Sequence, residues 1–388
     1  MHDEKQLSAF LMPTSGFIAR ITFLLVSGSV AAMIFATAHG IIGKAEARFL
    51  SDTDQVECDS LSVKPGREFA ADSYVHQPLA ANAAIDPKSD LWVKDLLRQI
   101  KKYYGAATVN VDKFSPPLYV VGPSQPTVRV KAARPEDPKW SFAPLQERWE
   151  AVPLPDGFAS APGTDGEAIV YQPSTGMYWE FWRLQKTGQK VLDSAGRQTD
   201  QWSAAWGGHI EDLRANPGYF VTTAEGYKFG TAATGLALLA GLITIEDQRR
   251  GAIEHPLHFA IPETRERSIW AFPAQRSDGQ VNYDDAIPEG VTFRLPADLN
   301  LDAIDMDPYA RLLAKAVQKY GMVLRDVSGS VNFYAENPLN RYNPNPYYGA
   351  GGFLRCPHSV YAWSCSSTTR LRGFPWDKLQ ALRARLNY

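Results

Sequence analysis

The clearest pattern of apolar and polar positions lies near the middle of the chain, where two apolar runs flank a turn. The run AIVYQ (168–172) leads into the turn PSTG (173–176), and the chain returns as MYWEFWRL (177–184). Apolar runs on either side of a turn rich in Pro, Ser and Gly are typical of a β-hairpin. Neither face of the second run is cleanly polar, so we expect both faces to be covered, as in the inner sheet of a sandwich.

Short alternating runs separated by turns continue on both sides of this hairpin. TVNVD (108–112), LYVV (118–121), TVRVK (127–131) and VTFRLP (291–296) each predict a strand. The segment 322–336 predicts a compact hairpin about Ser328-Gly329. Pro256, within IEHPLHFAIP, predicts an edge strand or a bulge, because proline cannot donate to a sheet ladder.

Helical periodicity is restricted to a few segments. We expect Ser89 to cap a helix over 89–104 and Gly105 to end it. Further short helices are predicted at 145–152 and 245–250, from Asp305 or Asp307 to Tyr320, and in the run FPWDKLQALRARL (374–386). Strands dominate, and the regular crossover helices of a parallel α/β fold are absent. The sequence therefore predicts a mainly β fold, an antiparallel sandwich or jelly-roll-like domain with a few peripheral helices.

The domain organisation follows from the two ends of the chain. Residues 1–38 predict a signal peptide or membrane anchor, with Arg20 before an apolar run and the cleavage pattern Ala36-Thr37-Ala38 before His39. The run approaches the ~20 residues that span a bilayer, so an uncleaved anchor is the alternative. We expect a linker at 39–86 and one β-rich domain at 87–388, which ends in a long loop and a helix (337–388).

Net charge, the N-terminal segment and the cysteines indicate which partners the protein has and in which compartment it lies. The 388 residues carry a formal net charge of −2, which gives no sign of a nucleic-acid partner. The N-terminal segment predicts a secreted, periplasmic or cell-surface protein, with membrane contact only through that segment if it is uncleaved. Cys356 and Cys365 bracket a loop and could form a disulfide, which would leave Cys58 over; three free thiols are the alternative.

Longer motifs carry a resemblance to other proteins. They include GTDGEAIVYQPSTGMYWEFWRL (163–184), WGGHI (206–210), ATGLALLAGLITIED (233–247) and IEHPLHFAIP (253–262). These stretches, within most of residues 89–336, resemble a group of uncharacterised exported bacterial proteins. The resemblance implies a jelly-roll-like domain and brings no activity, because a fold does not fix a function.

Asp165 and Glu180 are the residues that we expect to carry catalysis. Glycoside hydrolysis needs two carboxyl groups across the scissile bond, about 5–5.5 Å apart in retaining enzymes and ~6.5–9.5 Å apart in inverting ones. Glu180 has apolar neighbours on its own face, so its pKa rises unless it has a partner. The alternative is structural, with Asp165 shaping a Thr-Asp-Gly turn and Glu180 paired with an arginine.

His209 and His255 are expected to support catalysis. They could act as general base and neutralising group of a polysaccharide lyase, or hold a metal with Asp165. The alternative for each is a histidine that is hydrogen-bonded in the core. His255 and His258 would point to opposite faces of a strand, which is not a usual metal pattern.

The predicted substrate-binding residues are aromatic, basic and acidic. Tryptophans could stack on sugar rings, although plain core packing is the alternative. The set comprises Trp179, Trp182, Trp206, Trp270, Arg276 and Asp278. Asp326 and Glu336 could complete an acidic cleft or bind calcium. No EF-hand spacing supports calcium, and the sequence predicts neither a metal site nor a cofactor.

Missing motifs exclude several enzyme classes. The sequence has no GxSxG elbow, no HExxH, no P-loop and no GxGxxG that follows a strand. We therefore expect an exported carbohydrate-active protein, a glycoside hydrolase or polysaccharide lyase whose partner is a polysaccharide or oligosaccharide. The alternatives are a non-catalytic carbohydrate-binding protein and a cell-surface structural or assembly protein. An assembly role would use the apolar segment 230–244 and the loop 337–373 for contacts.

Overall fold

The computed structural model describes residues 69–387, except 135, 138, 340, 343, 349, 350 and 355–370. The predicted signal peptide or anchor, its cleavage site and all three cysteines lie outside these residues. All described residues belong to one unit of the chain. Within that part of the chain, no helix is both long and apolar enough to cross a membrane.

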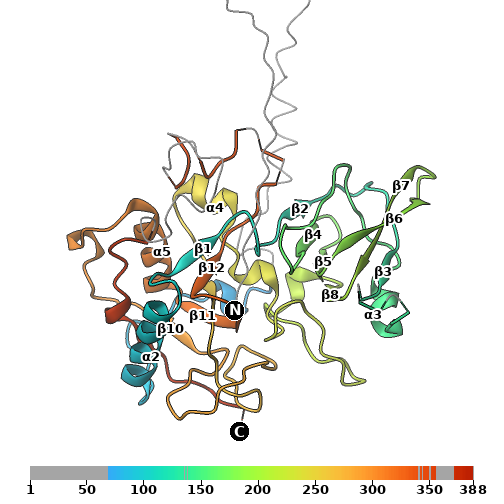
Figure 1. Cartoon of the computed structure of the whole chain (residues 1–388). Helices are drawn as coiled ribbons and strands as arrows, with labels where there is room; N and C mark the ends of the chain where they lie inside the picture. Colours follow the sequence, from blue (N-terminus) through green and yellow to red (C-terminus); the bar gives the residue numbers. More distant parts are fainter. Residues whose placement is uncertain are drawn as a thin grey trace, which may run out of the picture. The chain divides into compact units, whose positions relative to one another are not determined.

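The described strands form three mixed sheets (Figure 1). The six-stranded sheet has the order β1 (Thr108–Asn110), β12 (Asn332–Tyr334), β9 (Leu257–Ile261), β11 (Met322–Val327), β10 (Thr292–Arg294) and β13 (Gln380–Ala381). The four-stranded sheet has the order β2 (Leu118–Val120), β4 (Ala168–Gln172), β5 (Met177–Trp182) and β8 (Trp206–Ile210). The three-stranded sheet has the order β3 (Val130–Ala132), β7 (Gln198–Ala204) and β6 (Gln185–Leu192). The prediction of a mainly β fold is confirmed.

The sequence pattern predicted an antiparallel sandwich, but the strand pairing is mixed. Strands β1 and β12, β9 and β11, β2 and β4, and β3 and β7 run parallel. Each of these pairs joins segments far apart in the chain. Turn motifs in the sequence indicate only pairing between neighbouring strands, so they could not predict these parallel pairs. The predicted hairpin of β4 and β5 is confirmed as an antiparallel pair.

The helices are short and lie between the strands. The α-helices are α2 (Ser89–Lys102), α3 (Ala143–Arg148), α4 (Ile245–Arg250) and α5 (Pro308–Lys319). The 3-10 turns are η1 (Tyr74–His76), η2 (Leu213–Ala215), η3 (Leu238–Gly241), η4 (Leu301–Ala303) and η6 (Trp376–Lys378). The predicted helices at 89–104 and 245–250 and the late helix are confirmed in position, and the helix predicted at 145–152 lies at 143–148. The predicted cap is wrong, because Ser89 is the first residue of α2 and Lys88 takes the N-cap position. Asp307 caps α5 by accepting from Tyr309 N, and Gly251 ends α4 in the left-handed conformation.

Three local predictions are wrong. Segment 322–336 is not a hairpin, because β9 lies between β11 and β12 and pairs with both. Pro256 marks neither an edge strand nor a bulge, since it precedes the central strand β9 and the register shift against β9 lies in β11. The predicted C-terminal helix is instead η6 and β13, because Ala381 is buried in the pairing of β13 with β10.

Two hydrophobic cores hold these layers together. The first contains the inner residues of the six-stranded sheet with the buried faces of α2 and α5. The second lies around β4, β5 and β8 and includes residues 237–240 and Leu242. Those loop residues are at most 3% exposed, so this part of the apolar segment 230–244 is core and offers no surface for assembly.

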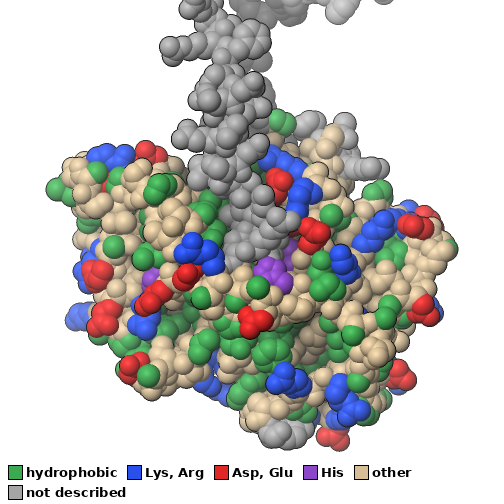
Figure 2. Space-filling view, turned by 180° about the vertical axis from the view of Figure 1, so that it is seen from behind, with side chains coloured by type: hydrophobic (Ala, Val, Ile, Leu, Met, Phe, Trp, Pro, Cys, Tyr) green, Lys and Arg blue, Asp and Glu red, His purple; other side chains and the backbone are tan. Residues whose placement is uncertain are grey.

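Part of the predicted linker also belongs to the domain. Phe69 and Val75 are 3% and 1% exposed and pack into the second core. Ser73 caps η1 and donates to Pro217 O at 2.6 Å. The linker prediction is therefore wrong for residues 69–86. On the face drawn in Figure 2, acidic and basic side chains of the described residues are interspersed.

Candidate functional site

A cavity of about 1090 Å³ opens between the six-stranded and four-stranded sheets. We call it the central cleft. Residues of β1, β11 and β12 line it from one sheet, and Trp182 of β5 and Trp206 of β8 line it from the other. Loops 164–167, 231–233 and 276–278 complete its walls. Clefts of this size with a few convergent polar groups are the usual place for a ligand site.

A β-bulge aims two consecutive side chains at the cleft. The register of β11 against β9 shifts between Leu324 and Asp326. Arg325 and Asp326 therefore both line the cleft, although neighbouring residues of a regular strand point to opposite faces. Bulges are common beside active sites because they redirect side chains in this way.

Arg325 lies at the base of the cleft with much of its hydrogen-bonding capacity unused. The side chain is 1% exposed, its guanidinium stacks on the Tyr334 ring at 3.6 Å, and Nη2 lies 3.9 Å from Glu167 Oε1. Its Nε and Nη1 have no hydrogen-bond partner among the described residues. Burial opposes the charge, but Tyr334 and nearby acids hold the pKa of Arg325 above its usual value. Buried donors of this kind call for a ligand or water.

Glu167 is the acidic counterpart of Arg325. It is 6% exposed, and its Oε2 has no hydrogen-bond partner within the described part of the chain. Burial raises the pKa of Glu167 to about 8, although the charge of Arg325 works in the opposite direction. Glu167 therefore holds a proton at neutral pH and can donate it.

Asp165 and Asp326 add carboxylates on different walls. Asp165 is half-buried, and its Oδ1 accepts from Trp182 Nε1 at 3.4 Å. Burial raises the pKa of Asp326 to about 7, against the influence of Arg325 and of backbone donors at Ala233 and Val327. The cleft thus places buried acids of raised pKa beside a more open carboxylate, an arrangement that suits acid–base chemistry.

Aromatic rings surround the polar base of the cleft. Trp182 and Trp206 are opposite residues of the paired strands β5 and β8. Trp206 is held from behind by Phe142, which stacks on it at 5.7 Å. Tyr104 and Phe114 are 82% and 40% exposed, and both have left-handed backbone conformations, with φ of 65° and 55°. Such conformations are rare for aromatic residues and concentrate at ligand sites.

Arg276 lines the cleft but organises its wall. The guanidinium donates to the backbone carbonyls of Phe229, Gly230, Ala232 and Ala233 at 2.7–3.0 Å, and also to Lys228 O. These bonds fix the loop that borders the cleft. The predicted substrate-binding role of Arg276 is therefore replaced by a positioning role.

Glu180 does not line the central cleft. It is 0% exposed, and its Oε1 accepts from Thr231 N at 2.5 Å. Its Oε2 accepts from Leu238 N at 2.8 Å and from the Tyr178 hydroxyl at 2.7 Å. Burial raises the pKa of Glu180, while these donors favour the ionised form. The predicted catalytic pair of Asp165 and Glu180 is corrected, because Glu180 is a buried anchor for segment 231–238.

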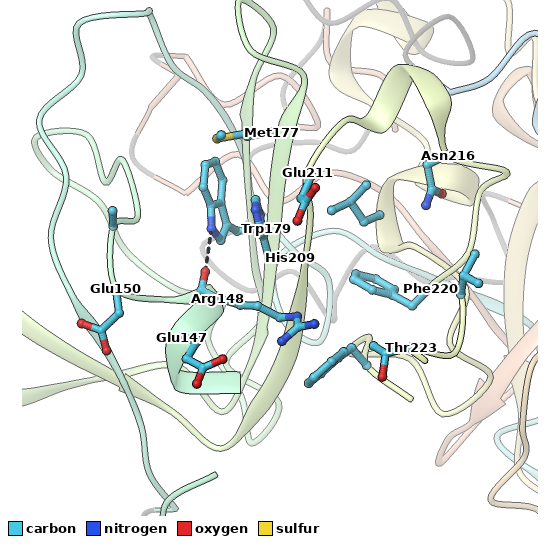
Figure 3. Close-up of a pocket in the computed structure, with 14 residues that line it drawn as sticks. Glu147, Arg148, Glu150, Met177, Trp179, His209, Glu211, Asn216, Phe220 and Thr223 are labelled. Atoms are coloured by element: carbon cyan, nitrogen blue, oxygen red, sulfur yellow. Dashed lines mark hydrogen bonds between the residues drawn. The ribbon is translucent and has the colours of Figure 1, made fainter. Parts of the chain in front are cut away.

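His209 and Trp179 lie in a second pocket of about 550 Å³ (Figure 3). Alternation along β5 puts Trp179 on the opposite face from Trp182. The His209 ring stacks on Trp179 at 4.7 Å, and its Nδ1 donates to Tyr178 O at 3.0 Å. Burial lowers the pKa of His209, so the ring is neutral. The two residues are thus separated from the acids of the central cleft.

His255 and Trp270 line neither pocket. His255 is 1% exposed and contacts Asp247 Oδ2 at 3.3 Å through Nε2. Trp270 forms a β-bridge with Glu289 and lies beneath the Lys228 ammonium at 5.6 Å. The structural alternative holds for His255, which is a core histidine, and Trp270 takes no part in the cleft.

Asp326 and Glu336, which were expected to complete one acidic cleft or calcium site, lie in different places. Glu336 is 4% exposed and accepts from Ile245 N and Arg341 Nη2, each at 2.9 Å, away from the central cleft. Asp326 instead lies beside Asp278 and Glu289, and one carboxylate oxygen of each is within 4.8 Å of the others. These three are a group among the described residues that could hold a metal ion.

The structure thus brings Asp165, Trp182, Trp206, Arg276 and Asp278 to the central cleft. Sequence reasoning missed further lining residues, namely Tyr104, Phe114, Glu167, Arg325 and Tyr334. Glu167 had a usable signal, because it follows Asp165 within the same motif. Arg325 had none, since the bulge that aims it depends on pairing with a distant strand.

Comparison with known proteins gives no indication of family or function. No family model matches the chain, and no curated protein or solved structure is similar to it beyond chance. The functional interpretation therefore rests on the geometry of the cleft.

Proposed function

We propose that this is an exported carbohydrate-active protein that binds a polysaccharide or oligosaccharide in the central cleft and cleaves it as a glycoside hydrolase. The observation that carries the proposal is the pairing of Glu167 with Arg325. Both are buried at the base of an open cleft, and both keep hydrogen-bonding atoms without a partner among the described residues. Sugar hydroxyls are donors and acceptors that suit such groups.

Glu167 is the proposed proton donor to the leaving oxygen. Its raised pKa, about 8, keeps it protonated at neutral pH, as a glycosidase acid requires. Asp165, on the same loop and less buried, is the proposed second carboxylate. Arg325 stabilises negative charge that develops as Glu167 loses its proton, and Trp182 and Trp206 supply surfaces on which sugar rings stack.

A polysaccharide lyase is an alternative form of this proposal, and the contact between Arg325 and Tyr334 favours it. The guanidinium of Arg325 lies against the Tyr334 ring at 3.6 Å. An arginine that neutralises a uronate carboxylate beside a tyrosine that moves a proton would serve β-elimination. A non-catalytic carbohydrate-binding protein is the second candidate, and the exposed rings of Tyr104 and Phe114 at the cleft rim favour it.

The location and architecture proposed here rest on the sequence. A protein that acts on extracellular or envelope polysaccharide belongs outside the cytoplasm, and the N-terminal apolar run supports a secreted, periplasmic or cell-surface location. The jelly-roll-like sandwich also stays a proposal, and the parallel pairs depart from its antiparallel pattern.

The test is a screen of the purified full-length chain against bacterial, plant and fungal polysaccharides. Reducing ends report hydrolysis, and absorbance of unsaturated uronates reports a lyase. We expect release of reducing ends without unsaturated products. Unsaturated products would establish the lyase variant. Retention on an immobilised glycan without release would establish the binding protein, and neither release nor retention would overturn the proposal.

A further inference from the structure

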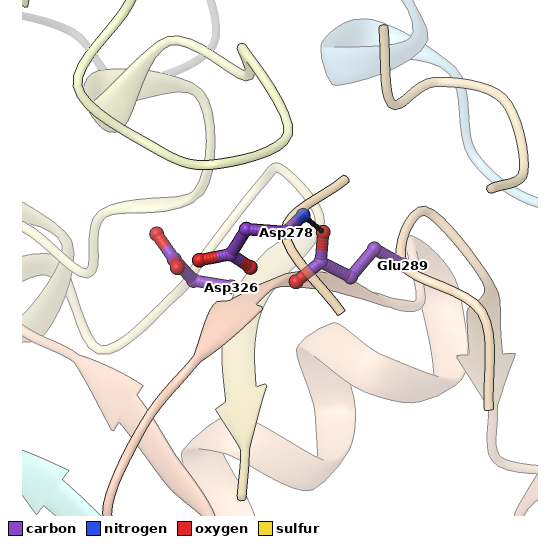
Figure 4. Close-up of side chains that lie close together, drawn as sticks. All are labelled: Asp278, Glu289 and Asp326. Carbon is purple, nitrogen blue, oxygen red and sulfur yellow. Dashed lines mark hydrogen bonds between the residues drawn. The ribbon is translucent and has the colours of Figure 1, made fainter. Parts of the chain in front are cut away.

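We propose that Asp278, Glu289 and Asp326 form a binding site for one calcium-class divalent cation on the wall of the central cleft. Figure 4 shows the three carboxylates gathered together, from the loop 276–278, the segment before β10 and the bulged strand β11. This site goes beyond the proposed hydrolase, because cation binding is measured without any saccharide.

The spacing of the carboxylates fits one calcium ion. One oxygen from each residue lies within 4.8 Å of the others. Calcium takes oxygen ligands at about 2.3–2.6 Å, so two ligands on opposite sides of the ion are ~4.6–5.2 Å apart. The three oxygens can therefore surround one ion without moving apart. The set contains only carboxylate oxygens, the donor type that hard cations prefer.

Glu289 gives an independent indication of a missing partner. Its side chain is 0% exposed, and Oε1 has no hydrogen-bond partner among the residues described. Its other oxygen, Oε2, accepts from Asp278 N at 3.3 Å, and the carboxylate points toward Asp278 and Asp326 (Figure 4). A buried carboxylate oxygen left unpaired is costly, and a bound cation would satisfy it.

In the described part of the chain, the neighbouring arginines Arg276 and Arg325 form no hydrogen bond or ion pair with these three carboxylates. Arg276 donates to the carbonyls of the loop 228–233, and Arg325 contacts Glu167 and Tyr334. Burial and the mutual repulsion of the cluster raise the pKa of Glu289 and Asp326.

The placement suggests how the ion would be used. Asp278 and Asp326 line the central cleft, while Glu289 supports them from the buried side. Three protein oxygens leave several of the 6–8 calcium positions open, and these would face the cleft. A sugar hydroxyl or carboxylate could take such a position, and this last step alone rests on the proposed function.

The test measures Ca²⁺ binding to the full-length chain after removal of bound ions with EDTA. Calorimetric titration and thermal unfolding are compared for the unaltered protein, Asp278→Asn, Glu289→Gln and the control Asp165→Asn. Asp278 is exposed, so its replacement leaves the fold intact, and Asp165 is a cleft carboxylate outside the cluster.

We expect one Ca²⁺ per chain, a rise in melting temperature on binding, and at least tenfold weaker binding in Asp278→Asn and Glu289→Gln. Binding to Asp165→Asn should be unchanged. The proposal is overturned if the unaltered protein binds no Ca²⁺ at millimolar concentration, or if all four proteins bind it equally. In the first case the cluster is a set of carboxyl groups that share protons, and the hydrolase proposal still stands.

Discussion

The guanidinium of Arg325 lies 3.9 Å from the carboxylate of Glu167 at the base of the central cleft. The two side chains come from different parts of the chain, one from a bulged strand of the six-stranded sheet and the other from the loop before β4. Both keep polar atoms without partners among the described residues. Folding therefore brings together a buried acid and a buried guanidinium cation, whose free polar atoms a ligand or water would satisfy.

Glu180→Gln should destabilise the protein by about 2–4 kcal/mol, because a buried network is broken. The carboxylate accepts from Thr231 N, Leu238 N and the Tyr178 hydroxyl, and an amide NH₂ would face donors. Urea unfolding measures the loss. Tyr178→Phe, which removes one bond, should cost about 1 kcal/mol. Unchanged stability of Glu180→Gln together with lost activity would return Glu180 to a catalytic role.

The pH dependence of stability should report Glu167. Its pKa is raised from 4.5 to about 8 by burial, so the folded state binds the proton more tightly than the unfolded state. The contribution of Glu167 to the free energy of unfolding is then largest below about pH 4.5 and falls as the pH rises towards 8. Asp326, with a pKa raised to about 7, contributes in the same direction.

Glu167→Gln removes one of these two contributions. We expect the variant to gain about 1–3 kcal/mol over the unaltered protein between pH 5 and pH 9, with a smaller slope remaining from Asp326. Urea unfolding at a series of pH values measures both slopes. Parallel slopes for the two proteins would mean that Glu167 has no raised pKa.

Much of the local structure was predictable, and the limits have a physical cause. Thr244 and Asp247 form a capping box at the start of α4, and Gly251 ends it, so short-range chemistry set both ends. The β4–β5 hairpin was equally local. The polar hairpin of β6 and β7 was not predicted, because β6 is exposed along almost its whole length and shows no apolar alternation.

The candidate site was harder to predict than the elements. Asp165 and Trp182 were found because they sit in one hairpin segment, and they do share the cleft. Glu180 was chosen for its chemistry, but a carboxylate among aromatic neighbours looks the same in sequence whether it faces a ligand or backbone N–H groups. Arg325 depends on a bulge against β9, which is set by tertiary pairing.

Trp182→Ala should weaken binding of the saccharide found in the screen by about tenfold, or ~1.4 kcal/mol. The ring lines the cleft and is only partly buried, so its loss removes a stacking surface with little effect on the core. Trp270→Ala is the matched control, because Trp270 is also partly buried but lies outside the cleft. Calorimetry measures both affinities. Equal weakening in the two variants would argue against stacking in the cleft.

The central claim is that chemistry takes place in the cleft of Glu167 and away from the pocket of His209. The most direct measurement is the rate at which the unaltered protein, Glu167→Gln and His209→Ala release reducing ends from the saccharide identified in the screen. Circular dichroism checks that each protein is folded. Loss of a general acid typically costs about 10²–10⁴-fold in rate. The account predicts a loss of this size in Glu167→Gln and an unchanged rate in His209→Ala. An unchanged rate in Glu167→Gln, or a comparable loss in His209→Ala, would contradict it.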